Sequence, residues 1–221
     1  MSPFGGPSPR SRRLPMVIWH VCISGFLQSE ARMNGILRLW LDTVRPLQDP
    51  RTFTTYRRWN SHWASLAEFI QNTRGSGELR VGVYAYSYGA GWGAMRLATA
   101  LRRRGIAVDE MVLSDPVYRH GCRSLAWLSL LRGPRIRVPA NVQRLTWFYQ
   151  RTNRPAGHAL VDAAGNPLPG LFVPGVIHQA MDDLPAFHEA CRAAALSLHA
   201  QRESLEMQPA ANGSLVLPGR A

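Results

Sequence analysis

The segment LRVGVYAYSYGAGWGA, residues 79–94, combines a strand, a tight turn and the start of a helix. Residues 79–86 are mostly β-branched, aromatic or apolar, which predicts a buried strand. Residues 95–101 have helical spacing, and Gly105 is a natural C-cap. Ser87 therefore lies at a strand-to-helix turn, with its hydroxyl at the edge of a sheet. The next N–H and the helix N-terminus would point at an oxyanion formed there.

This turn resembles the nucleophile elbow of the α/β-hydrolase family. Ala85-Tyr86-Ser87-Tyr88-Gly89 stands in place of Gly-x-Ser-x-Gly, with alanine for the first glycine but a small side chain retained. The resemblance implies that Ser87 is a nucleophile. The residues alone leave a second interpretation open, in which Ser87 caps its helix in an ordinary βα loop.

The chain of 221 residues is long enough for one α/β domain with a substantial core. Its 46% hydrophobic fraction and seven tryptophans indicate a globular protein. We expect a disordered lead-in over residues 1–15, a single domain over 16–200 and a disordered tail over 201–221.

The charge is strongly positive, with a formal net charge of +12. All 26 basic residues are arginine, and they are dispersed along the chain rather than gathered in one stretch. This dispersion favours no specific nucleic-acid partner, whereas peripheral contact with an anionic surface stays open. The three cysteines, Cys22, Cys122 and Cys191, lack metal-ligand spacing, and we expect no metal and no cofactor.

The N-terminal region permits two interpretations. Ser11-Arg12-Arg13 and the apolar run to Cys22 resemble a twin-arginine export signal. The run contains His20 and lacks a nearby cleavage site, so a first core strand is favoured. No stretch approaches the ~20 apolar residues of a membrane span, and we expect a cytoplasmic protein with no transmembrane segment.

Strands and helices alternate along the chain, which predicts an α/β fold: a mostly parallel sheet with helices on both faces, in three layers. Residues 118–141 are hard to interpret, because an apolar helix near 124–131 could form a lid or simply pack in the core. The expected strands cover residues 17–24, 79–86, 108–114, 142–150 and 171–177, and the expected helices cover 30–44, 52–72, 95–101 and about 183–200.

Reactive groups in such sheets collect at the carboxyl ends of strands, where Ser87, Asp115 and His178 all fall. Their chain order matches the order of nucleophile, acid and histidine in the α/β-hydrolase family. The resemblance therefore implies a Ser-His-Asp triad, although the common family position for the acid is one strand later. Asp162, Asp182 and Asp183 remain rivals of Asp115, the last two also as caps of the final helix.

The same resemblance implies an oxyanion hole from the backbone N–H groups of Phe26 and Tyr88, although Gly25-Phe26 also fits a simple turn. Tyr86, Trp92 and Trp127 would line the substrate site. The expected function is a serine hydrolase that cleaves a small-molecule or lipid-like carboxylic ester through an acyl-enzyme. The alternative is a non-catalytic scaffold that binds an anionic polymer or protein partner through arginine.

Overall fold

The computed structural model describes residues 15–122, 125, 127, 130–131 and 133–207. Within these residues, six strands form one parallel sheet in the order β2-β1-β3-β4-β6-β8. They are β1 (Met16–Ser24), β2 (Thr52–Arg58), β3 (Glu78–Tyr86), β4 (Val108–Ser114), β6 (Val142–Tyr149) and β8 (Leu171–Phe172). Two short strands, β5 (Ile136–Arg137) and β7 (Leu160–Val161), pair separately.

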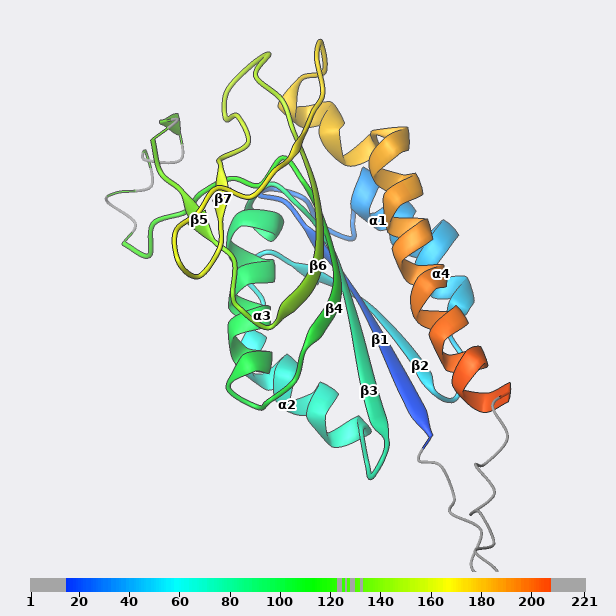
Figure 1. Cartoon of the computed structure of the whole chain (residues 1–221). Coiled ribbons are helices and arrows are strands. Elements are labelled where there is room, and N and C mark those ends of the chain that lie inside the picture. Colours follow the sequence, from blue (N-terminus) through cyan, green and yellow to red (C-terminus); the bar gives the residue numbers. More distant parts are fainter. Residues whose placement is uncertain (1–14, 123–124, 126, 128–129, 132, 208–221) are drawn as a thin grey trace, which may run out of the picture.

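Helices cover both faces of this sheet (Figure 1). One face carries α2 (Trp63–Thr73) and α3 (Ala94–Arg102), and the other carries α1 (Gly35–Leu39) and α4 (Pro185–Met207). A π-helical turn, Gly89–Gly93, leads into α3, and a 3-10 helix, His178–Asp183, precedes α4. Further turns, Trp40–Val44 and Arg45–Leu47, follow α1. The predicted three-layer α/β fold is therefore confirmed.

The buried strands supply both faces of the sheet through their alternation of side chains. In β1, the side chains of Val17, Trp19, Val21 and Ile23 join the core under α2 and α3. Cys22 packs on the opposite face with Tyr84, Phe187 and Cys191, under α1 and α4. Because both faces are covered, the central strands are apolar along almost their whole length.

One predicted helix is wrong in its first half. The expected helix over residues 52–72 is strand β2 followed by α2, with a turn at Trp59-Asn60 between them. The stretch Thr52-Phe53-Thr54-Thr55-Tyr56 is β-branched and aromatic, which suits an extended chain. The helix predicted over 30–44 also begins later, at Gly35, because the Asn34 side chain caps it by accepting from the N–H of Leu37 at 3.0 Å.

The last strand and the last helix differ in length from the prediction. The strand expected over residues 171–177 is only Leu171–Phe172, since Pro174 and Gly175, with φ of +74°, end it. Helix α4 continues to Met207, seven residues into the predicted tail. The rest of that tail, the lead-in up to residue 14 and parts of the segment 124–131 lie outside the described residues. None of the helices in the described part of the chain is long and apolar enough to cross a bilayer.

A buried imidazole lies in the middle of β1, facing α4. The Nδ1 atom of His20 is 3.0 Å from the Tyr84 hydroxyl, and its Nε2 atom is 3.3 Å from Nε2 of His199 on α4. Burial, together with the charges of His199 and Arg202, lowers the pKa of His20 from 6.5 to about 3. His20 is therefore neutral in the folded protein at pH values where it is charged in the unfolded chain.

We predict that this histidine makes the fold sensitive to acid. Between pH 6.5 and 3 the unfolded chain binds one more proton at His20 than the folded chain does, so stability falls as the pH falls. The difference at pH 5 corresponds to about 2 kcal/mol of unfolding free energy. Urea unfolding at pH 7 and pH 5 should show a smaller loss in His20→Gln than in the wild type.

The matched control is His62→Gln, since His62 precedes α2 without a side-chain cap bond. This variant should keep the wild-type loss between the two pH values. Equal losses in all three proteins would show that His20 does not set the acid sensitivity.

Candidate active site

The turn at Ser87 joins β3 to the helix through a strained backbone. Ser87 has φ of +55°, and its N–H donates to the carbonyl of Ser114 on the neighbouring strand at 3.0 Å. Its own carbonyl accepts from the N–H groups of Gly91 and Val117. Gly89 allows the close approach of β1, because a Cβ there would lie 2.4 Å from the carbonyl oxygen of Ser24. The turn thus has the sharp form expected of an elbow, with a nearly buried Ser87 at its apex.

A chain of hydrogen bonds joins the three residues that the sequence singled out. Ser87 Oγ lies 3.0 Å from His178 Nε2, and His178 Nδ1 lies 2.6 Å from Asp115 Oδ2. All three side chains are buried. Asp115 follows β4 directly, and β4 pairs with β3, so the serine and the carboxylate end neighbouring strands. The arrangement has the order hydroxyl, imidazole, carboxylate that proton transfer from a serine requires.

Further contacts, outside the Ser87–His178–Asp115 hydrogen bonds, also hold His178 in place. The backbone N–H of His178 donates to Asn153 Oδ1 at 2.6 Å, and the backbone carbonyl of His178 accepts from the Tyr86 hydroxyl at 2.7 Å. The rings of Tyr86 and His178 stack with 5.0 Å between their centroids. The hydroxyl of Ser114 donates to the carbonyl of Met181, which fastens the same 3-10 helix to β4. These contacts leave the ring little freedom to turn away from Ser87.

The rival acidic residues have other partners. Asp162 accepts from the backbone and side chain of Asn166 in an exposed turn. Asp183 pairs with Arg38 at 3.1 Å on the surface. Asp182 accepts from the N–H of Gly35 at 2.8 Å, so it serves α1 rather than α4. The Ser87 hydroxyl, likewise, bonds to His178, and no side chain caps the helix after it.

Asp182 anchors the loop after β1 through Gln28. Gln28 Nε2 donates to Asp182 Oδ2 at 2.6 Å, while Gln28 Oε1 accepts from the N–H of Gly25 at 2.8 Å. Burial raises the pKa of Asp182, and the bonds from Gly35 and Gln28 oppose that rise. Leu27 in this loop has φ of +63°. The bonds hold Gly25 against Ser87, since a Cβ on Gly25 would come 3.0 Å from the Ser87 Cβ.

A cavity of about 490 Å³ opens at Ser87 and His178. Its lining is mainly apolar, and two glutamines, Gln28 and Gln179, supply further polar atoms. Of the predicted wall, Tyr86 lines the cavity, but Trp92 and Trp127 are not among its described lining residues. The ring of Trp92 instead contacts the guanidinium groups of Arg96 and Arg119, at 4.2 and 5.2 Å from its centroid. The other lining residues are Phe26, Leu27, Tyr88, Leu130 and Pro155.

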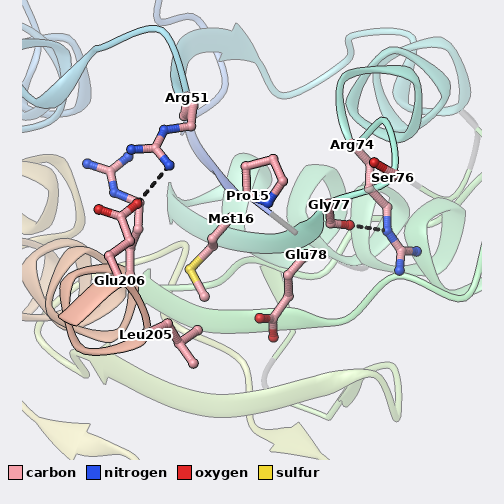
Figure 2. Close-up of a pocket in the computed structure, with 10 residues that line it drawn as sticks. Pro15, Met16, Arg51, Arg74, Ser76, Gly77, Glu78, Leu205 and Glu206 are labelled. Atoms are coloured by element: carbon pink, nitrogen blue, oxygen red, sulfur yellow. Dashed lines mark hydrogen bonds and ion pairs between the residues drawn. The ribbon is translucent and has the colours of Figure 1, made fainter. Parts of the chain in front are cut away.

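A larger cavity, of about 720 Å³, lies at the opposite edge of the sheet, where β1 and β3 begin and α4 ends (Figure 2). Its charged side chains pair with neighbours: Arg51 with Glu206 at 2.7 Å, and Glu78 with Arg80. The Arg74 Nε–H donates to the carbonyl of Gly77 at 2.9 Å. No serine and histidine occur together among its described lining residues.

Sequence reasoning missed the polar side chains that support the site. Gln28 and Asn153 bond to the elements described above, and Gln150 bonds to Asp115 by its backbone and its side chain. Glutamine and asparagine have no characteristic motif spacing. The one available signal was position, since Gln150 directly follows β6 at the same edge of the sheet.

Comparison with known proteins gives a structural match but no match in sequence. No family model matches the chain, and no curated protein matches it in sequence. Among solved structures, it is similar to RedJ, a thioesterase from the prodiginine biosynthetic pathway in Streptomyces coelicolor. The sequence identity is 12%, the match covers 88% of this chain and 91% of that chain, and the TM-score is 0.42. Membership of the α/β-hydrolase family stays a prediction.

We predict that Gly157 is required for the carboxylate to keep its place. A Cβ at this position would lie 2.3 Å from Asp115 Oδ1 and 2.9 Å from the Tyr149 Cβ. Gly157→Ala should therefore lower the unfolding free energy by about 1–3 kcal/mol, measured by urea unfolding. Gly133→Ala is the matched control, because a Cβ there meets no atom within 4 Å. Equal stability of the two variants would contradict the close packing around Asp115.

Proposed function

We propose that the protein is a serine hydrolase that cleaves carboxylic esters through an acyl-enzyme. The observation that carries the proposal is the continuous chain from Ser87 Oγ through His178 to Asp115, with distances of 3.0 and 2.6 Å. The chain ends at a cavity large enough for a small ligand. The three residues are assigned the roles of nucleophile, general base and orienting acid.

The reaction begins when Ser87 Oγ attacks the ester carbonyl carbon and its proton passes to His178 Nε2. The tetrahedral intermediate then collapses, and His178 returns the proton to the departing alcohol, which leaves an acyl-serine. Water then attacks the acyl carbon, with His178 taking its proton. The second tetrahedral intermediate collapses with release of the carboxylic acid, and His178 returns the proton to Ser87 Oγ. Asp115 accepts the Nδ1–H bond throughout and stabilises the imidazolium without becoming protonated.

The oxyanion of each tetrahedral intermediate needs donors close to Ser87. We assign this role to the backbone N–H groups of Tyr88 and Phe26, as the family resemblance implies. Tyr88 is the N-cap of the helical turn Gly89–Gly93, and the first backbone N–H groups of a helix have no acceptor within the helix. Phe26 belongs to the loop that Gln28 and Asp182 anchor beside Ser87.

The lining of the cavity favours a substrate with an apolar portion. Phe26, Leu27 and Leu130 are exposed there, although such side chains are usually buried. We therefore assign the site to a small-molecule or lipid-like carboxylic ester. A panel of oxygen esters and thioesters with acyl chains of increasing length would establish which bond and which chain length are preferred.

The first test is removal of the nucleophile. Ser87→Ala should lower ester turnover by about 10³-fold or more, because the covalent intermediate can no longer form. The wild type should be labelled covalently by a fluorophosphonate probe, and the variant should not. The variant should retain its urea unfolding midpoint. Unchanged turnover, or absence of labelling in the wild type, would refute the hydrolase and leave a binding scaffold as the alternative.

The second test separates Asp115 from its rival Asp162. Asp115→Asn should lower kcat strongly, by up to about 10⁴-fold, because an amide can no longer hold the imidazole in the required tautomer. Asp162→Asn should have little effect, since Asp162 bonds only within its own turn. Measuring kcat on one ester for both folded variants decides the assignment. The reverse ranking would move the acid to Asp162.

A further inference from the structure

Gln150 lies directly after β6, wholly buried, on the side of Asp115 away from Ser87. Its N–H donates to Asp115 Oδ1 at 3.1 Å, and its Nε2 donates to Asp115 Oδ2 at 3.0 Å. Oδ2 is the oxygen that also accepts from His178 Nδ1. One residue therefore bonds to both oxygens of the carboxylate that faces the imidazole.

The orientation of this amide follows from its other partners. Gln150 Oε1 accepts from the N–H of Asn153 at 3.0 Å. Nε2 also lies 3.1 Å from the carbonyl of Pro155. A flipped amide would bring Oε1 against the carboxylate and against that carbonyl, so only the observed orientation satisfies every group.

The turn after β6, to which the Gln150 side chain bonds, also contacts His178. The backbone N–H of Asn153 donates to Gln150, and the Asn153 side chain accepts from the backbone N–H of His178. Asn153 Nδ2 donates to Gln179 Oε1 at 2.9 Å. Asp115 and His178 are thus held by the same short turn after β6, although 63 residues separate them.

We propose that Gln150 is a positioning residue that keeps the Asp115 carboxylate aimed at His178. This inference rests on the proposed hydrolase function. A neutral donor on a buried carboxylate stabilises its charge without adding another negative charge. Gln150 occupies the end of β6, the strand after the one that supplies Asp115, where a carboxylate would compete for the imidazole. The amide at this position leaves Asp115 as the single acid.

Two substitutions test this role. Gln150→Leu removes the amide, and kcat should fall about 10- to 100-fold, the usual effect of losing a hydrogen bond to a charged group. KM should change less than about twofold, because Gln150 does not line the cavity. Rates are expressed per active site, counted by fluorophosphonate labelling, so that loss of folded protein does not enter them.

Gln150→Glu preserves shape but adds a second carboxyl group about 3 Å from Asp115. The two groups share one proton, and when it leaves, the extra negative charge favours the imidazolium form of His178. The rising limb of the kcat/KM pH profile should therefore move up by about one pH unit. Other titratable or charged groups lie near Asp115 and His178, and this variant leaves their side chains intact. They are Tyr86, Arg151, His158 and Asp182.

The matched control is Gln143→Glu, which makes the same change at an exposed position of the same strand. It should keep the wild-type kcat and pH profile. A purely structural role for Gln150 would lower thermal stability yet leave kcat per active site and the pH midpoint at wild-type values, which would overturn the inference. Because rates are counted per labelled active site, the folded fraction of Gln150→Glu decides the question even if Gln150→Leu fails to fold.

The outcomes also separate this inference from the function it rests on. A wild-type protein that neither hydrolyses esters nor reacts with the fluorophosphonate refutes the hydrolase itself. An active, labelled wild type with unaltered Gln150 variants refutes only the positioning role.

Discussion

The parallel pairing of β3 with β4 is the constraint on which the site depends. The register places Tyr86 opposite Ser114, so the residues that follow, Ser87 and Asp115, leave the sheet side by side. The N–H of Ser87 continues the ladder by donating to Ser114, and the N–H of Asp115 donates to Phe148 on β6. A shift of one residue in this register would turn one of the two side chains to the other face of the sheet.

The same edge carries the strained backbone of the described residues. Leu27, Ser87 and Asp115 are the non-glycine residues there with positive φ, and they follow β1, β3 and β4. Each such conformation costs about 1–2 kcal/mol. The bonds that oppose this cost are specific: Gln28 holds the loop of Leu27, Ser114 receives the N–H of Ser87, and Gln150 holds Asp115. Strain that clusters where strands end is typical of functional sites, and here it supports the proposed active site.

The sequence was most informative where local pattern and position agreed. Ser87 was identifiable because a strand, small flanking residues and a helix meet there, and His178 because it precedes the final helix. Strand β2 was not predicted, because the aromatic residues in and after it also fit a helical spacing: Phe53, Tyr56, Trp59 and Trp63. The β-branched threonines among them favour the strand that the structure has. The direction of the Trp92 side chain, which contacts two arginines, depends on tertiary contacts that no local pattern records.

Two of the three histidines buried in the described part of the chain, His20 and His178, show why residue type alone does not identify a site. His20 and His178 are both almost inaccessible to solvent, and both lie against the same parallel sheet. His20 contacts a phenol and a second imidazole, neither of which supplies a negative charge, and burial holds its pKa far below 6.5. His178 lies between a hydroxyl and a carboxylate, so the positive charge of a proton gained at Nε2 would be compensated by the carboxylate beside Nδ1. In the proposed mechanism that compensation depends on how the Asp115 carboxylate is aimed, and the two donors of Gln150 hold both of its oxygens.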